Sequence, residues 1–175
     1  MSSLISGILV IAAFLVSSVL IFGTFLTTSV TQSQSLKELA KINQEKLRSE
    51  LSITSASVTS AVSASGTEMT LVVDNTGSQS GVSFDQMDVI IEYTDSSDNL
   101  VRTYLSYNAA GAGDNQWTSG ATGSTPDSFN PNLWDPDESF ALDLRVVPEL
   151  KGGSSALVVV GTPQGVNDQT TLTND

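Results

Sequence analysis

The side chains in this sequence that could do chemistry are mainly carboxylates, because its 175 residues include no His and no Cys. Thiolate chemistry, disulfides, imidazole bases and the usual zinc sites are therefore excluded. Oxygen-rich loops can bind calcium, and Asp95, Asp98, Asp135 and Asp137 lie in stretches that read as loops. Their order does not follow an EF-hand loop. We expect no metal and no cofactor, with calcium at these four residues as the alternative.

Catalysis would need further features that the sequence does not offer. Paired-carboxylate chemistry requires two acids that face one cleft, and nothing marks such a pair. There is no Gly-rich phosphate loop and no nucleophile–base pair. We therefore expect a protein that is not an enzyme and has no catalytic residues.

Charge is unevenly distributed along the chain, which carries a net charge of −12. Residues 1–50 hold four bases and three acids, whereas residues 51–175 hold three bases and sixteen acids. An acidic surface repels phosphate backbones, so nucleic acid is not an expected partner. The Ser- and Thr-rich, Lys-poor second part is typical of exported β domains.

The first element that must position the rest is an uncharged segment, LISGILVIAAFLVSSVLIFGTFL, at residues 4–26. A helix of this length spans a ~30 Å hydrocarbon core with some tilt. Small residues recur at four-residue spacing within it, which allows close helix packing. The stretch at residues 36–51 is also strongly helical, so we expect one helix from about residue 2 to residue 50. It is either a membrane anchor with an amphipathic continuation or a rod that packs against copies of itself.

The bases near this segment all follow it: Lys37, Lys41, Lys46 and Arg48. Bases beside a membrane helix tend to stay in the cytoplasm, which conflicts with an exported C-terminal part. One explanation is that a basic leader once preceded Met1 and was removed. The alternative is a true initiator Met1 with inverted topology.

From Ile53 onward, the period changes from helical to alternating, as in half-buried antiparallel strands. The predicted strands are 53–62, 68–75, 86–94, 100–107, 139–147, 156–163 and, more weakly, 166–173, separated by turn residues such as Asn75-Thr76-Gly77-Ser78. About seven short strands indicate an immunoglobulin-like sandwich. The fold class is thus α+β: a long N-terminal hydrophobic α-helix followed by an all-β immunoglobulin-like antiparallel sandwich. The domains are residues 1–50 and residues 51–175.

A Gly-, Ser- and Asn-rich insertion at residues 108–137 interrupts the strands. It contains Trp117, Phe129 and Trp134, which we expect to pin it to the sandwich. A loop of this length is usually functional or mobile. No Asn-x-Ser/Thr sequon occurs in the chain, so any glycosylation would use hydroxyl acceptors.

Three segments, in this order, carry a resemblance to a known family: TLVVDNTGSQSGVSFDQMDVIIEYTD, LWDPDESFALDLRV and VVVGTPQGV. Together with the uncharged N-terminal helix, they resemble the archaellins, the type IV pilin-like subunits of the archaeal flagellar filament. The resemblance implies that a prepilin-type peptidase removes a basic leader. Ile5 stands where bacterial type IV pilins usually have Glu, which fits archaellins better.

The resemblance implies a structural subunit of an extracellular motility filament that polymerises with itself through the N-terminal helix. It also implies membrane insertion before assembly, and the leader peptidase and archaellum assembly machinery as partners. The expected assembly residues are Leu4, Ile5, Gly7, Ile8, Ile11, Phe14, Leu15, Val19, Phe22 and Phe25. The alternatives are a membrane-anchored archaellum stator or accessory protein that binds the cell envelope, and an adhesive type IV-like pilus subunit.

Overall fold

The computed structural model describes residues 2–60, 66–78, 83–120, 123–126, 130 and 133–174, without the side chains of residues 2–4 and 60. The chain divides into two compact units, Met1–Asn43 and Gln44–Asp175. We call the second one the β unit.

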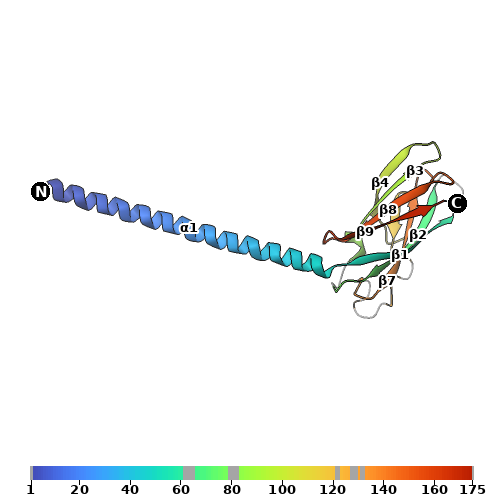
Figure 1. Ribbon diagram of the computed structural model, residues 1–175, viewed down its shortest axis with the longest axis horizontal. Coiled ribbons are helices and arrows are strands. Elements are labelled where there is room, and N and C mark those ends of the chain that lie inside the picture. Colours follow the sequence, from blue (N-terminus) through green and yellow to red (C-terminus); the bar gives the residue numbers. More distant parts are fainter. Residues whose placement is uncertain are drawn as a thin grey trace. The chain divides into compact units, whose positions relative to one another are not determined.

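The helix α1 runs over Ser2–Arg48 (Figure 1). No Pro interrupts these residues, and the Leu and Ala residues and the charged continuation of α1 favour a helix. It ends where the Ser49 N–H donates to the Lys46 carbonyl at 3.2 Å. Lys46 and Arg48 lie in the last turn, where positive charge complements the helix dipole. The predicted helix over residues 2–50 is confirmed, with an end two residues earlier.

Strands make up most of the β unit: β1 (Leu51–Ser60), β2 (Thr67–Asn75), β3 (Asp88–Thr94), β4 (Leu100–Tyr107), β5 (Gln116–Thr118), β6 (Ser124–Thr125), β7 (Ser139–Val146), β8 (Ser155–Gly161) and β9 (Asn167–Thr173). Seven of them match the predicted strands. The predicted third strand begins two residues too early, because Phe84–Gln86 form a short 3-10 helix, η1, just before β3.

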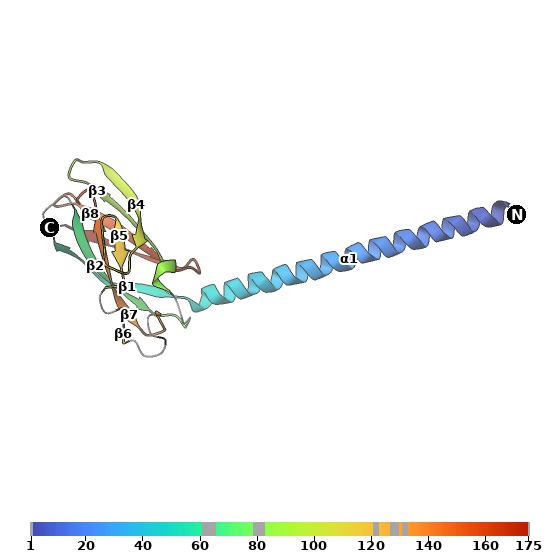
Figure 2. The same cartoon turned by 180° about the vertical axis from the view of Figure 1, so that it is seen from behind.

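The strands follow the order β1-β2-β7-β5-β4-β3-β8-β9, and β6 pairs with β7. One layer of the sandwich contains β1, β2, β7 and β5, and the other contains β4, β3, β8 and β9. Figure 2 shows β5, which pairs with β4 on one side and with β7 on the other. β5 joins the two layers by pairing parallel with β4, whereas the other pairs are antiparallel.

The outer edges of the two layers, β1 and β9, lie beside each other. The Asp168 carboxylate accepts a hydrogen bond from the Ile53 N–H at 2.9 Å, so a side chain satisfies a backbone donor at this edge. Covering an edge in this way protects it from pairing with strands of other chains. The sandwich is therefore close to a closed barrel.

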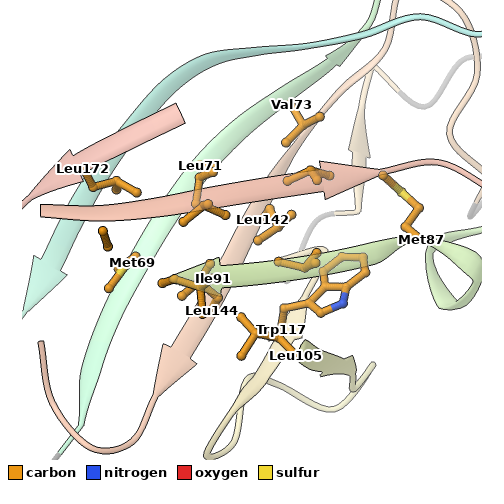
Figure 3. Packing of buried hydrophobic residues seen from close by; sticks show 14 of the residues in the cluster. Met69, Leu71, Val73, Met87, Ile91, Leu105, Trp117, Leu142, Leu144 and Leu172 are labelled. Carbon is orange, nitrogen blue, oxygen red and sulfur yellow. The ribbon is translucent and has the colours of Figure 1, made fainter. Parts of the chain in front are cut away.

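The core lies between the layers, where alternate residues of β2, β3, β7 and β8 are buried. Figure 3 shows Leu71, Leu142 and Leu144 from one layer packed with Ile91 and Leu105 from the other. Strict alternation places apolar side chains on the inner face of each strand, and their burial supplies most of the stability.

The insertion at residues 108–137 is part of this packing, because it contributes β5, β6 and two buried tryptophans. Trp117 and Trp134 are 0% and 1% exposed, which confirms that they pin the segment to the sandwich. Both rings lie near Phe140, with centroids 6.4 and 5.2 Å away. Phe129, the third expected anchor, lies outside the described residues.

Candidate assembly surface

The surface of α1 is apolar and exposed along its first half. The expected assembly residues with large described side chains, Ile5, Ile8, Ile11, Phe14, Leu15, Val19, Phe22 and Phe25, are each 59–73% exposed. Gly7 is exposed too, and a Cβ there would meet nothing within 4 Å. The side chain of Leu4 is outside the described set. The structure thus places these residues on one helix but does not test their role.

Exposed apolar side chains occupy every side of α1 rather than one stripe. Ile8, Leu9, Val10 and Ile11 are consecutive, and all are more than 60% exposed. A helix that is apolar all round is normally buried in a large core or a membrane. By length and composition, α1 could cross a membrane, and a signal sequence would have the same properties.

Several hydroxyl groups on α1 donate hydrogen bonds to the backbone of the helix itself. Ser17 and Ser18 donate to the carbonyls of Ala13 and Phe14, each at 2.9 Å. The same pattern continues at Thr24, Thr27, Thr28, Thr31 and Ser35, each donating three or four residues back. A buried polar group costs free energy only when it lacks a partner. These side chains can therefore enter a dry environment without an unmet hydrogen bond.

The end of α1 is held by the turn after β2, inside the β unit. The Ser78 N–H donates to the Arg48 carbonyl at 2.7 Å, and the Gly77 N–H donates to the Glu50 carbonyl at 3.1 Å. The Arg48 guanidinium donates back to the carbonyl of Ser78 at 3.2 Å. A Cβ on Gly77 would lie 2.5 Å from the Glu50 nitrogen and 2.6 Å from the Arg48 oxygen. Only glycine fits this close approach of two backbones.

Asn75 connects this turn to the segment around Trp134. The side-chain oxygen of Asn75 accepts a hydrogen bond from the Gly77 N–H at 3.1 Å. The backbone N–H of Asn75 donates to the Glu138 carbonyl at 2.9 Å. The Trp134 indole N–H donates to the same Glu138 carbonyl at 2.9 Å. Buried Asn75 thus links the helix end to the core. The sequence identified a turn here but gave no sign that it holds α1.

Asp95 and Asp98, two of the calcium candidates, lie in the hairpin between β3 and β4. One oxygen of Asp95 accepts from the N–H groups of Ser97 and Asn99, both at 2.8 Å. The bonds from Asn99 hold the pKa of the Asp95 carboxyl below its ordinary value. The carboxylate of Asp98 accepts a hydrogen bond from the Lys151 ammonium group. These carboxylates organise the hairpin.

Asp135 and Asp137, the other two candidates, lie just before β7. The oxygens of buried Asp135 accept from the backbone and side-chain nitrogens of Asn130 at 3.0 and 3.3 Å. Asp137 is exposed, with a φ of 63°. Within the described part of the chain, no three acidic side chains gather in a way that could hold a metal ion. Calcium at these residues stays an untested prediction.

Comparisons with known proteins bear on the whole chain. The archaeal-type flagellin family profile matches residues 2–172. The archaeal flagellum of Methanospirillum hungatei strain JF1 is similar in structure, with a TM-score of 0.62, 13% identity, and coverage of 98% of this chain and 94% of that one. The archaellum periplasmic stator protein FlaG from Sulfolobus acidocaldarius has a TM-score of 0.46 and 17% identity, over 70% of this chain and 98% of that one. No curated protein matches the sequence.

Proposed function

The chain belongs to the archaeal-type flagellin family, and from that premise we propose that it polymerises by burying α1 among the α1 helices of neighbouring copies. It is a structural subunit of the extracellular archaellum filament, which is built from many copies of such a chain. The proposal concerns which residues hold the filament together, namely the apolar side chains from Ile5 to Phe25.

One observation carries this proposal: fourteen large apolar side chains between Ile5 and Leu26 are 48–73% exposed in the single chain. Covering a fully exposed side chain of this kind contributes about 1.5–3 kcal/mol relative to water, so leaving these fourteen partly exposed side chains in water would cost roughly 20 kcal/mol. The helix therefore needs a cover, and neighbouring α1 helices can provide it in the filament. No charged residue precedes Lys37, so a bundle of these segments contains no buried unpaired ion.

Before assembly, the same surface is best covered by lipid. We include in the proposal that α1 resides in the cytoplasmic membrane until the subunit is added to the filament. The internally bonded hydroxyls and the length of the apolar segment support this state. The proposal also includes a prepilin-type peptidase and archaellum assembly machinery as partners of the chain at this stage.

Charged substitutions within α1 test the proposal. Ile11→Asp and Phe14→Asp each place a carboxylate where every side of the helix would be buried. Both side chains are more than 60% exposed in the single chain, so neither change removes packing within the subunit. We expect electron microscopy of sheared surface material to show no filaments, while the variant chain accumulates in the membrane fraction.

Gln44→Asp is the matched control, because it adds the same charge to α1 at an exposed position beyond the uncharged segment. The new carboxylate lies between Lys41 and Arg48 in the sequence, so it has nearby positive partners. We expect normal filaments from this control. Normal filaments from Ile11→Asp or Phe14→Asp would contradict the proposal.

A further inference from the structure

The two outward faces of the sandwich differ in character. Among the described residues from Leu51 onward, three large apolar side chains remain exposed: Ile90, Leu100 and Tyr104, at 40%, 69% and 54%. All three lie on β3 and β4, where Ile90 is paired with Tyr104. Their inward neighbours, such as Val89 and Leu105, are fully buried, so these three point outward.

Arg102 lies between Leu100 and Tyr104 on the same outward face of β4. It is one of the three bases in residues 51–175, against sixteen acids. Its side chain is 72% exposed, and its Nε donates to Glu92 at 2.7 Å. A guanidinium has five N–H donors in a planar fork, so it can bind a second carboxylate as well. We call Ile90, Leu100, Arg102 and Tyr104 the outer patch.

The layer that contains β2 and β7 has a hollow surface with carboxylates instead of an exposed apolar one with a base. A recess of about 470 Å³ lies over β2 and β7, lined by Glu68, Thr70 and Asp143 and by the small residues Ala109–Ala112. Thr70 donates to one oxygen of Asp143 at 2.7 Å. The second oxygen of Asp143 lies beside Gly120, where even a Cβ would remain 3.6 Å away. We call this hollow the acidic recess.

The residues of the recess fit a partner that brings a cation and apolar side chains together. Glu68 and Asp143 provide negative charge, which the Arg145 guanidinium, 3.9 Å from Glu68, offsets only in part. The small Ala and Gly residues of the lining leave room for bulky groups. The outer patch of another copy has these properties, with Arg102 flanked by Leu100 and Tyr104. Domains with this excess of acids repel one another, so a contact between copies needs to bring the few bases to the acids.

We propose that the outer patch of one subunit docks into the acidic recess of the next, as a second contact between copies in the filament. The contact is heterologous, because the patch and the recess lie on different layers of the sandwich. A heterologous contact builds an open helical row whenever the rotation between copies does not close into a ring, so this contact is compatible with a filament. This inference rests on the proposed filament function and adds the partner surfaces of the β unit.

Cysteine cross-linking tests the contact without background, because the native chain has no Cys. Filaments of a Tyr104→Cys/Ala110→Cys double variant are treated with a short bis-maleimide and separated by denaturing electrophoresis. Both positions are exposed, so the substitutions leave the core intact. We expect a ladder of dimers, trimers and longer species, whereas filaments of either single variant remain monomeric after the same treatment.

Two results would overturn the inference. Intact filaments of the double variant that give no ladder would show that patch and recess are not in contact. Dimers from Tyr104→Cys alone would show that patch meets patch, which is an isologous contact. Failure of the unsubstituted chain to form filaments is a different result, since it would refute the proposed function and this inference with it.

Discussion

Gly77→Ala is the substitution for which the structure gives the clearest magnitude. The added Cβ would lie 2.5 Å from the Glu50 nitrogen and 2.6 Å from the Arg48 oxygen, both backbone atoms. Relieving the overlap moves the turn and weakens the hydrogen bonds from Gly77 to Glu50 and from Ser78 to Arg48. Each bond contributes about 0.5–1.5 kcal/mol, and overpacking costs about 1–3 kcal/mol more.

The net destabilisation is about 2–5 kcal/mol, after the small gain that replacing glycine brings by restricting the unfolded chain. For a unit of this size we expect the Tm to fall by roughly 10 °C. Thermal unfolding of the full chain in detergent, followed by near-ultraviolet circular dichroism, measures this directly because both tryptophans are buried in the β unit.

Gly152→Ala is the matched control, since Gly152 is exposed and a Cβ there would meet nothing within 4 Å. We expect its Tm to stay within a few degrees of the native value. A Gly77→Ala variant as stable as this control would refute the reasoning that the turn grips the helix end through a backbone contact that only glycine permits.

Two further substitutions test the core and the hairpin. Leu142→Ala removes a fully buried side chain of β7, so we expect urea unfolding to show a loss of about 2–5 kcal/mol, and an unchanged midpoint would contradict the packing described. Asp95→Asn keeps a side-chain oxygen but removes the ionisable carboxyl group. Hydrogen bonds from Asn99 lower the pKa of that carboxyl group in the native chain. A carboxyl whose pKa is lower in the folded state stabilises the fold at pH values above its ordinary pKa, and this stabilisation is lost as the pH falls through the folded-state pKa. We therefore expect the native chain to have a higher unfolding free energy than the variant at neutral pH. This difference should shrink below about pH 4, and a pH-independent difference would count against the interpretation.

Patterns of short range predicted most of the fold. Alternation located seven strands within two residues of most of their ends, and the uncharged run located α1. β5 and β6 were not predicted from the sequence, because strands of three and two residues are too short to show a period. The joining of the two layers was not predicted either, because the parallel pairing of β4 with β5 depends on contacts that no local pattern encodes.

The contacts that matter for the candidate site are of longer range. The residue types of Asn75-Thr76-Gly77-Ser78 predict a turn. Its hydrogen bond with Arg48, however, joins residues thirty positions apart. In β4, both faces carry apolar side chains, so alternation alone could not tell that Leu100 and Tyr104 point outward. That assignment came from the burial of Leu105 and of the paired residues on β3.

The central claim is that α1 builds the interior of the filament, and a helical reconstruction of native filaments by electron cryo-microscopy tests it most directly. We predict that the α1 helices of many copies pack together along the filament axis, with the apolar side chains from Ile5 to Phe25 in contact with one another and the strands outside. Filaments whose axis is formed by β units, or in which these side chains contact no other α1, would contradict the account.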